Sequence, residues 1–383
     1  LLGAGKRLIT GESLFTTVFT HQGQGKARVA FSAPVPGAIL PIKLDQVGGR
    51  LICQKDAFLA AAKGVSIGGK KVKFELVAED DAADPKQGTA VAQKLVDQKV
   101  SGVVGHLNSG TSIPASKIYS DAGIPQITPS STNPKLTRQG FKTTFRVVAD
   151  DVHLGGTLGR YAVADLKGKA IAVIDDRTAY GQGVADEFEK AAKAAGGKII
   201  GHEFTNDKAT DFMPILTNIK GKKPDVVFFG GMDAVGGPML KQMQSLGINA
   251  RFMGGDGICT NELPKLAGAA LKDSMVVCAE AGGVEGSGKK SMDEFSARFK
   301  KRFNDDVKLY APYVYDAVNV MVAAMVKAGS SDPAKYLPVL AKTEGFQGVT
   351  GSISFDDKGD IKNGALTLYT FKGGVREQVA VKR

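Results

Sequence analysis

The chain has 383 residues, a formal net charge of +11, 48 glycines and 43% hydrophobic residues, a composition typical of a loop-rich α/β protein with room for two domains. No stretch approaches the roughly 18 uninterrupted apolar residues of a membrane-spanning helix. The basic residues are neither clustered nor interleaved with aromatic side chains, and Trp is absent, so we expect no nucleic-acid partner. No secretion signal is visible in the opening LLGAGKRLITGES.

From residue 69 onward, apolar runs with strand spacing alternate with amphipathic helical stretches, which predicts parallel sheets. A first series of strands and helices is followed by a second, so we expect two lobes. The first series has strands at 70–80, 101–107 and 124–132 and helices at 84–98 and 112–123. The second has strands at 169–176, 198–204, 225–231 and 250–257 and helices at 180–196, 212–222 and 237–247.

Further elements are expected around and after these series. In the helix at 180–196, Val184, Phe188, Ala191 and Ala195 share one face and should cover a sheet. A short helix at 260–270 leads to a strand at 274–282. A long apolar-faced helix is predicted at 311–329, and the alternation around turn residues at 351–374 predicts a hairpin.

The stretch VVGHLNSGTSIPASKIY, residues 103–119, joins a strand to a helix through a polar loop. The first N–H groups of such a helix are unpaired and lie at the positive end of its dipole, so the loop suits a carboxylate or a phosphate. The glycine spacing of a phosphate loop or a dinucleotide fingerprint is missing. The plainer alternative is that Ser109 or Thr111 only caps the helix. Polar or glycine-rich loops follow nearly every strand, which predicts a site outside the carboxyl ends of the strands.

Three cysteines occur, at positions 53, 259 and 278, and none lies in a CxxC or Cys/His cluster, so we expect no metal. Cys259 and Cys278 flank the helix at 260–270. If paired, they would close a short loop worth about 3 kcal/mol in an oxidising compartment. The alternative is two buried free thiols.

The segments EDDAADPKQ, VVGHLNSG, PASKIYSDAGIPQITPSSTNPKLT, DDRTAYGQG and FMGGDG occur in this order. They make the chain from about residue 66 to the end resemble the leucine/isoleucine/valine-binding proteins, the periplasmic substrate-binding components of branched-chain amino-acid ABC transporters. The resemblance implies an α/β fold of the two-lobed type I periplasmic binding proteins, each lobe a doubly wound, mostly parallel sheet. It places lobe 1 at 66–150 plus 280–359 and lobe 2 at 151–279 plus 360–383, after an atypical N-terminal segment, 1–65.

The resemblance also implies roles for individual residues around a bound amino acid. In the loop Leu107–Asn108–Ser109, the hydroxyl and N–H of Ser109 would hold the ligand carboxylate. Ser130 and Thr132 would grip the ammonium and the carboxylate. The remaining ligand-binding residues are Asp256, which would pair with the ammonium in place of the family's Glu, Tyr180 and Tyr310, which would line and close the side-chain pocket, and Met232, which stands where the family has Tyr.

The family's disulfide positions correspond here to Ala83 and Asn108, so that bridge is absent, and Cys259–Cys278 resembles an alternative bridge. Residues 1–65 resemble instead part of the altered-inheritance-of-mitochondria type β-sheet proteins, which indicates a fusion. The first strand and helix of the family are therefore missing. We expect Ala27–Gly37 to replace the central strand and residues 49–64 to replace the helix, with Leu51, Phe58 and Leu59 as packing residues.

The resulting interpretation is a non-catalytic protein that captures Leu, Ile, Val or a related apolar L-amino acid by hinge closure. It would deliver this ligand to an inner-membrane ABC permease, work as a periplasmic monomer and need no cofactor. His21, His106, His153 and His202 are scattered, and no nucleophile has an adjacent base. The alternatives are an amide- or amino-acid-sensing regulator on the same fold, a fusion relic with a disabled site, and, third, a dehydrogenase, against which the missing fingerprint argues.

Overall fold

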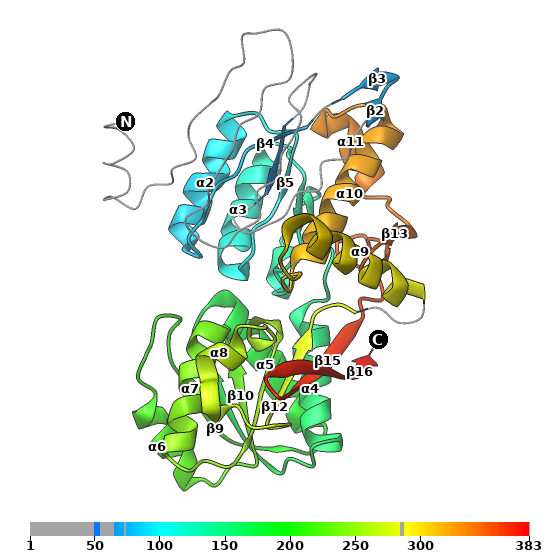
Figure 1. Cartoon of the computed structure of the whole chain (residues 1–383). Coiled ribbons are helices and arrows are strands. Elements are labelled where there is room, and N and C mark those ends of the chain that lie inside the picture. Colours follow the sequence, from blue (N-terminus) through cyan, green and yellow to red (C-terminus); the bar gives the residue numbers. More distant parts are fainter. Residues whose placement is uncertain (1–49, 54–64, 73, 284–286, 383) are drawn as a thin grey trace, which may run out of the picture. The chain divides into compact units, whose positions relative to one another are not determined.

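The computed structural model describes residues 50–53, 65–72, 74–283 and 287–382, and all of these belong to one compact unit, Ile42–Arg383. Two main sheets organise this described part (Figure 1). No helix in it is long and apolar enough to cross a membrane.

The first sheet has the strand order β4-β1-β5-β6-β7 in the described chain, with every neighbouring pair parallel. Helices α2 and α3 lie on one side of it and α10 and α11 on the other (Figure 1). The side chains of consecutive strand residues point to opposite faces of the sheet. Val103 packs with the hydrophobic cluster of α2 and α3, and Val104 packs with the cluster of α10. The elements are β1 (Arg50–Cys53), β4 (Glu75–Leu76), β5 (Gly102–Val104), β6 (Gln126–Thr128), β7 (Thr144–Arg146), α2 (Pro85–Asp97), α3 (Ser109–Asp121), α10 (Ala311–Ala328) and α11 (Pro333–Leu340).

The central position of this sheet differs from the sequence prediction. The strand between β4 and β5 is β1, Arg50–Cys53, with Leu51 paired to both Leu76 and Gly102. The assignment of this place to Ala27–Gly37 is therefore wrong, and so is the assignment of residues 50–53 to a helix. The apolar run Leu-Ile-Cys, with its β-branched Ile, has a composition typical of strands in parallel sheets. The segment 27–37 itself lies outside the described residues, as do Phe58 and Leu59.

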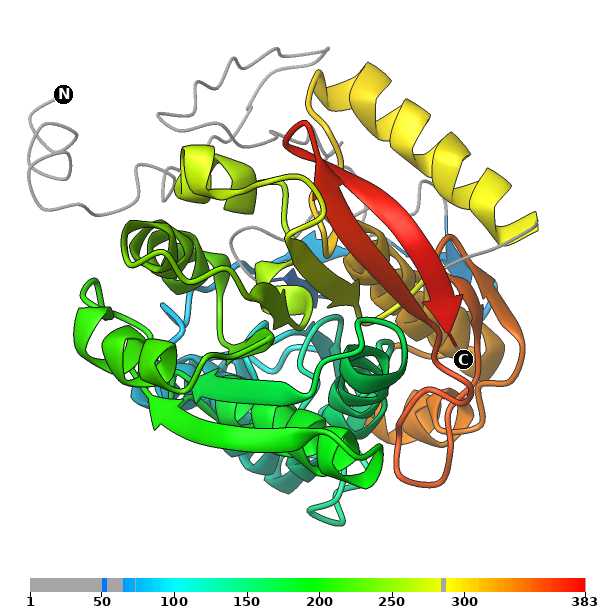
Figure 2. The same cartoon turned by 90° about the horizontal axis from the view of Figure 1, so that it is seen from below.

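The second sheet has the order β16-β15-β12-β11-β10-β8-β9 within the described chain. Strands β12 to β9 are parallel, whereas β15 and β16 are antiparallel additions, so β16 and β9 form its opposite edges (Figure 2). Its strands are β8 (Ala170–Asp175), β9 (Lys198–Phe204), β10 (Val226–Gly230), β11 (Arg251–Gly254), β12 (Val276–Glu280), β15 (Leu366–Lys372) and β16 (Val375–Lys382).

Helices cover both faces of the second sheet. One cluster joins α4 and α5 to the sheet, with Phe188 stacked on Phe228 at 3.8 Å between ring centroids. The other cluster joins α6, α7 and α8 to the opposite side chains of the same strands. Of the predicted α5 face, Val184 and Phe188 are buried, but Ala191 is only half-buried and Ala195 is exposed, because the helix ends at Ala194. The helices are α4 (Asp151–Ala164), α5 (Ala179–Ala194), α6 (Met213–Gly221), α7 (Asp233–Ser245) and α8 (Leu263–Ala267).

Two glycines of α4 explain its close approach to α5. A Cβ on Gly155 would lie 2.6 Å from the Val184 carbonyl oxygen, and one on Gly159 would lie 2.5 Å from the Phe188 carbonyl oxygen. Only glycine fits at these two positions, one turn apart on the same helix face.

The predicted hairpin at 351–374 is also wrong. β14 (Gly351–Ile353) pairs with β13 (Phe346–Gly348), whereas β15 pairs with β12 and β16 in the second sheet. The two halves of this alternating stretch thus belong to different sheets. The remaining elements are β2 (Ser66–Ile67), β3 (Lys70–Lys71), α9 (Ser287–Phe303) and the 3₁₀ turns η1 (Pro134–Leu136), η2 (Asp256–Ile258) and η3 (Gly268–Ala270).

The chain leaves one sheet region for the other at residues 147–150, after Glu280, and at residues 359–365. The first two passages run side by side, since the Ala149 amide donates to the Ala281 carbonyl at 3.1 Å. A hinge between the two sheet regions would have to lie in these three passages.

Candidate functional site

The loop that opens α3 keeps two backbone donors free. Asn108 is the N-cap residue in extended conformation, and its side chain makes no capping bond. The amides of Thr111 and Ser112 donate to the Asn108 carbonyl, but those of Ser109 and Gly110 have no partner in the described chain. Ser109 is buried and its Oγ accepts a hydrogen bond from the Asn133 amide at 3.2 Å. Neither Ser109 nor Thr111 therefore caps the helix, and the free amides remain available to an anion.

The His106 side chain holds this loop in place through two buried polar contacts. Its Nδ1 lies 2.7 Å from an Asp81 carboxylate oxygen and its Nε2 lies 2.9 Å from the Tyr119 hydroxyl, all three side chains being buried. The His106 carbonyl accepts from the hydroxyls of Thr128 and Ser112. This histidine is thus a structural member of the loop.

A second loop, residues 129–133, lies against the first. The hydroxyls of Ser130 and Ser131 both donate to the Leu107 carbonyl at 2.9 Å. Thr132 is fully buried, and its carbonyl accepts from the Asp151 amide at 2.8 Å. The Thr132 hydroxyl has no hydrogen-bond partner among the described residues. A buried hydroxyl left in this way points to a polar ligand or a water.

Asp151, the first residue of α4, is a second buried group without a hydrogen-bond partner among the described residues. It was not among the site residues predicted from the sequence. It is fully buried, and neither carboxylate oxygen has a partner among the described residues. Burial raises the pKa of Asp151 well above its ordinary value and the charge of Asp256 raises it further, while the neighbouring Thr132 hydroxyl, which does not meet hydrogen-bond geometry, and the charge of Arg146 lower it. The adjacent Asp150 and Asp151 at the start of α4 are the sequence signal for this residue. One capping carboxylate is enough for a helix, and Asp150 provides it by accepting from the His153 amide, so Asp151 is not needed as a cap.

Asp256, Tyr180 and Tyr310 form a direct hydrogen-bonded group. The hydroxyls of Tyr180 and Tyr310 each donate to one Asp256 oxygen, both at 2.8 Å, and the Gly257 amide donates to the Tyr180 hydroxyl at 2.9 Å. Burial raises the pKa of Asp256, although both tyrosines lower it. Burial and then the Asp256 charge raise the pKa values of both tyrosine hydroxyls well above the ordinary value. The tyrosines therefore stay protonated donors at neutral pH.

Met232 is the N-cap residue of α7 and is half-buried. A Cβ on Gly257 would meet its sulfur at 2.9 Å, so the side chain lies beside the turn that carries Asp256. It forms no hydrogen bond in the described structure. This wall of the group is apolar and deformable, as expected of a thioether side chain.

A cavity of about 240 Å³ adjoins these groups. Three residues of the predicted set line it: Leu107, Ser130 and Tyr310. The others do not: Asn108, Ser109, Thr132, Tyr180, Met232 and Asp256. Its apolar lining comes from the side of the first sheet and includes Val104, Leu107 and Val314, whereas the side of the second sheet contributes polar residues. Its charged lining residues are Asp233, Glu262, Lys308 and Arg376. Arg376 is paired, since its Nη1 lies 3.4 Å from a Glu280 oxygen.

The turn that carries Asp256 is fastened by a disulfide. Cys259 and Cys278 are bonded with an S–S distance of 2.06 Å and a Cα–Cα distance of 5.3 Å, and both are fully buried. The bridge joins η2 to β12, and the Cys259 carbonyl also accepts from Arg376 Nη1 at 2.8 Å. Asp256 is thereby held on a rigid support.

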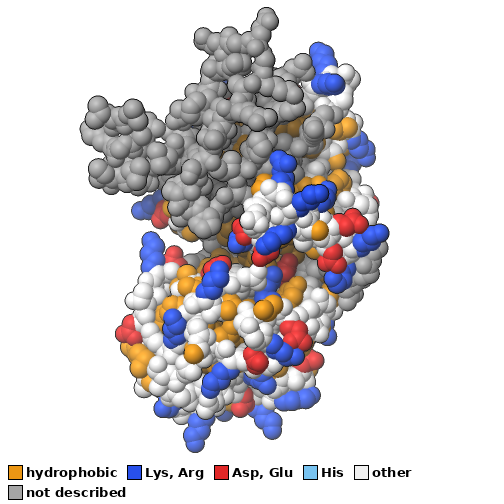
Figure 3. Space-filling model, in the orientation of Figure 1, with side chains coloured by type: hydrophobic (Ala, Val, Ile, Leu, Met, Phe, Trp, Pro, Cys, Tyr) orange, Lys and Arg blue, Asp and Glu red, His pale blue; other side chains and the backbone are white. Residues whose placement is uncertain are grey.

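The fold and these groups define a class: a two-sheet binding protein whose buried polar groups gather at the carboxyl ends of parallel strands, beside the passages between the sheets. No cluster of residues suited to a metal occurs in the described chain. Charged side chains of both signs are interspersed on the surface of Figure 3.

The chain belongs to the periplasmic binding protein family, whose pattern it matches over residues 51–375. It is 35% identical over 375 residues to the Leu/Ile/Val-binding protein homolog 1 of Brucella abortus, covering 96% of this chain and 97% of that protein. It is 34% identical over 353 residues to the leucine-, isoleucine-, valine-, threonine- and alanine-binding protein of Pseudomonas aeruginosa, covering 92% of each. The type I periplasmic binding protein fold is therefore established.

Solved structures give the same result. The leucine-binding protein LivK of Thermotoga maritima has a TM-score of 0.78 at 23% identity and covers 88% of this chain and 98% of its own. An ABC transporter substrate-binding protein of Desulfitobacterium hafniense, in complex with Leu, has a TM-score of 0.68 at 26% identity, covering 82% and 90%. At 23% identity, the similarity to LivK supports the fold alone.

Proposed function

We propose that this chain is an extracytoplasmic substrate-binding protein that captures an L-amino acid with an apolar side chain for an ABC transporter. The observation that carries the proposal is a set of buried polar groups of two kinds: free amides at the start of α3, and the carboxylates of Asp151, which has no hydrogen-bond partner among the described residues, and Asp256, which two tyrosine hydroxyls hold in place. Such a set suits a zwitterion, because an amino acid offers one carboxylate and one ammonium. The named ligands of the relatives support the same class.

In this proposal the ligand carboxylate binds the amides and hydroxyl at Ser109. The ammonium binds Asp256, Asp151 and the Thr132 hydroxyl, with Ser130 beside it. Each charge-assisted hydrogen bond contributes about 1.5–3 kcal/mol. The ligand side chain enters the cavity lined by Leu107 and Tyr310, with Met232 near its inner end.

Apolar selectivity follows from the charges around the cavity. Both cations of the lining already have acidic partners, Arg376 with Glu280 at 3.4 Å and Lys308 with Asp305 at 3.5 Å, so they offer little to an acidic side chain. Burying the apolar end of leucine among Val104, Leu107 and Val314 gives about 25 cal/mol per Å² of apolar surface. The side-chain carboxylate of a bound glutamate would bury less apolar surface in this cavity and would therefore gain less free energy.

Isothermal titration of the purified chain with Leu, Ile, Val, Phe and Glu tests the proposal. We expect saturable binding of the apolar amino acids with one site per chain, and weaker or no binding of Glu. Asp256→Asn should lose affinity, whereas Asp316→Asn should keep it, because Asp316 is a buried carboxylate in the first half of α10 whose partners are in the segment 349–350. No heat with any of them from a cooperatively folded chain would contradict the proposal.

We further propose a periplasmic location, a monomeric state, delivery to an inner-membrane permease, and lobes at 66–150 plus 280–359 and 151–279 plus 360–383. The likeness of residues 1–65 to the altered-inheritance-of-mitochondria type proteins stays a prediction. The Brucella relative aligns with 96% of the chain, so its alignment extends into these residues. Limited proteolysis of the purified protein, followed by mass spectrometry, would reveal whether residues 1–65 form a separate unit.

A further inference from the structure

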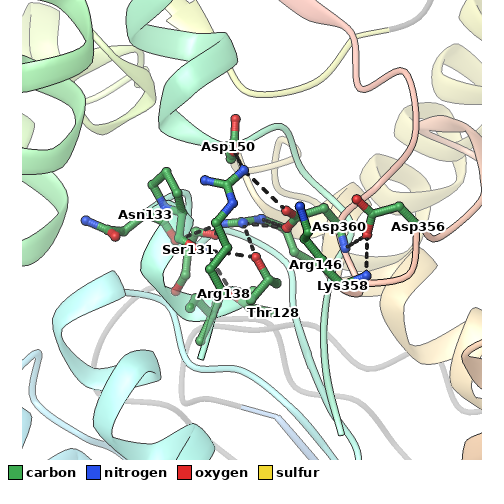
Figure 4. A network of polar contacts seen from close by, with 12 residues as sticks. Thr128, Ser131, Asn133, Arg138, Arg146, Asp150, Asp356, Lys358 and Asp360 are labelled. Atoms are coloured by element: carbon green, nitrogen blue, oxygen red, sulfur yellow. Dashed lines mark hydrogen bonds and ion pairs between the residues drawn. The ribbon is translucent and has the colours of Figure 1, made fainter. Parts of the chain in front are cut away.

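Arg146, the last residue of β7, is fully buried and uses every N–H of its guanidinium. Nε and Nη2 donate to Asp360 Oδ1, at 3.0 and 2.5 Å, and Nη2 also donates to the Thr137 hydroxyl at 3.0 Å. Nη1 donates to the carbonyls of Ser131 and Asn133, both at 3.0 Å. Five donors meet acceptors, which is the full capacity of this side chain (Figure 4).

The acceptors belong to two different parts of the proposed mechanism. Ser131 and Asn133 flank Thr132, whose buried hydroxyl is free for a ligand. Arg146 therefore holds the carbonyl groups of the residues on both sides of a proposed ligand residue without contacting the ligand. Ser130, which lines the cavity, directly precedes this fixed segment.

Asp360 belongs to the third passage between the sheets. It lies in the turn 356–360, where the amides of Lys358 and Asp360 donate to one Asp356 oxygen at 2.9 Å. The Arg146 amide donates to the Gly359 carbonyl at 2.9 Å. Gly359 has φ +91°, and a Cβ there would lie 2.1 Å from the Thr144 carbonyl oxygen, so the turn is seated tightly on β7. The chain continues from this turn into β15 of the second sheet.

The first passage is tied to the same cluster. Arg138 donates to Asp150 at 2.8 Å and lies 3.9 Å from the second oxygen of Asp360 (Figure 4). Asp150 precedes Asp151 and caps α4. The two arginines and two aspartates thus connect the ligand loop with two of the three passages, and their charges balance.

We propose that Arg146 is a positioning residue that couples the ligand loop to the hinge: it sets the position of Thr132 from the passage that holds Asp360. The inference rests on the proposed function for its ligand. The guanidinium is a rigid planar fork, so a rotation at the third passage displaces the peptide groups around Thr132, and a ligand that orders Thr132 stabilises one hinge angle. Replacing Asp360 breaks its ion pair with Arg146 and leaves the buried arginine in place. Asp360 is therefore the residue at which the coupling is tested.

The test uses the full chain with Asp360→Ala, the conservative variant Asp360→Asn, and Lys362→Gln as a matched control. Lys362 lies two residues further along the same passage and makes an exposed ion pair with Glu344 at 2.8 Å, away from Arg146. Amide hydrogen exchange without ligand is measured first. Exchange at residues 131 and 133 should rise about tenfold or more in Asp360→Ala, less in Asp360→Asn and not in Lys362→Gln, while β10 stays as in the wild type.

Leucine affinity is measured next, in a double-mutant cycle with Thr132→Val. Asp360→Ala should weaken binding about tenfold in the wild-type background and by less than twofold in the Thr132→Val background, because the coupling acts through Thr132. Equal losses in both backgrounds would overturn the proposal. If Asp360→Ala does not melt cooperatively, the same cycle is decided with Asp360→Asn.

The two proposals fail in different ways. Unchanged exchange at residues 131 and 133 in both Asp360 variants overturns the positioning role, whether or not an amino acid binds. A uniform rise in exchange over the whole chain, which a merely structural role would cause, overturns it as well. Absence of amino-acid binding in the wild type overturns the proposed function, and the exchange pattern then decides alone whether Arg146 links the loop to the passage.

Discussion

Asp151 gives the sharpest prediction, because its buried carboxylate has no partner among the described residues and lies near a second buried carboxylate, Asp256. Replacing it by Asn removes the charge and keeps the shape. If Asp151 contacts the ligand ammonium, the variant loses one charge-assisted hydrogen bond, about 1.5–3 kcal/mol, which corresponds to a Kd about 10 to 150 times higher. The apo protein should not suffer a comparable loss of stability.

The sign of the pH dependence follows from the pKa of Asp151, which burial raises well above its ordinary value in the folded chain. Between the ordinary aspartate pKa and this raised value, the unfolded chain has released the proton and the native chain has not. Wild-type stability therefore falls as pH rises through this window, with a limiting slope of about 1.4 kcal/mol per pH unit for one proton. Asp151→Asn should lack this contribution, so its stability relative to the wild type rises with pH.

Ligand binding has the opposite dependence. An ammonium favours the ionised carboxylate, so wild-type affinity should rise with pH up to the raised pKa, with release of protons on binding. Titration calorimetry at several pH values, in buffers of different ionisation enthalpy, measures affinity and proton release together, and denaturant unfolding without ligand measures stability.

Asp176→Asn is the matched control for this prediction. Asp176 is also buried, has one oxygen without a partner among the described residues, and has a pKa raised by burial. Its other oxygen accepts from Thr178 at the start of α5, so it is not a proposed ligand group. We expect this variant to change stability and to bind leucine normally. Wild-type affinity in Asp151→Asn, or an equal loss in both variants, would refute the reasoning.

Three further predictions concern the supports of the site. Cys259→Ser with Cys278→Ser opens a bridge spanning 19 positions, so the free energy of unfolding under oxidising conditions should fall by about 3 kcal/mol, measured by urea titration, and an unchanged midpoint would contradict this. Gly159→Val places a side chain against the α5 backbone and should cost about 3 kcal/mol, whereas Gly156→Ala, whose Cβ would meet only Arg160 at 3.4 Å, should be neutral or slightly stabilising in thermal melts. Tyr310→Phe removes one hydrogen bond to Asp256, so leucine affinity at neutral pH should fall and ligand-free stability should change by about 1 kcal/mol; equal affinity would remove Tyr310 from the site.

The sequence predicted those elements whose spacing and neighbours agree. The half-buried edge strand at 198–204 and the helices near 84–98 and 180–196 were placed within a few residues, because a run of strand-forming residues or an amphipathic period is visible in the local sequence. The N-terminal region was the exception. Arg50–Cys53 is a strand between β4 and β5, where both neighbours need backbone partners. The short run Leu-Ile-Cys is compatible with a strand but does not by itself reveal that need.

The candidate site divides in the same way. Tyr180, Tyr310 and Asp256 came from a family resemblance at matched positions, and the structure joins them by two hydrogen bonds of 2.8 Å, though their role with a ligand stays a prediction. Thr132 came from the same source. Arg146 could not be found from the sequence, because its partner Asp360 lies 214 positions away and the turn residues around Asp360 are typical of any exposed loop.

Asp150 and Asp151 show most directly what only the three-dimensional structure decides. They are the same residue type, adjacent in sequence, at the start of one helix, where either could cap it. Asp150 caps α4 and pairs with Arg138, whereas Asp151 is turned inward with both oxygens unpaired. A buried unpaired carboxylate weakens the ligand-free protein, and the fold keeps it beside a second carboxylate and an unused hydroxyl. An ammonium placed here gives Asp151 and the Thr132 hydroxyl a hydrogen-bonding partner and lies beside the charge of Asp256, which is why we assign the ligand's cationic end to this point.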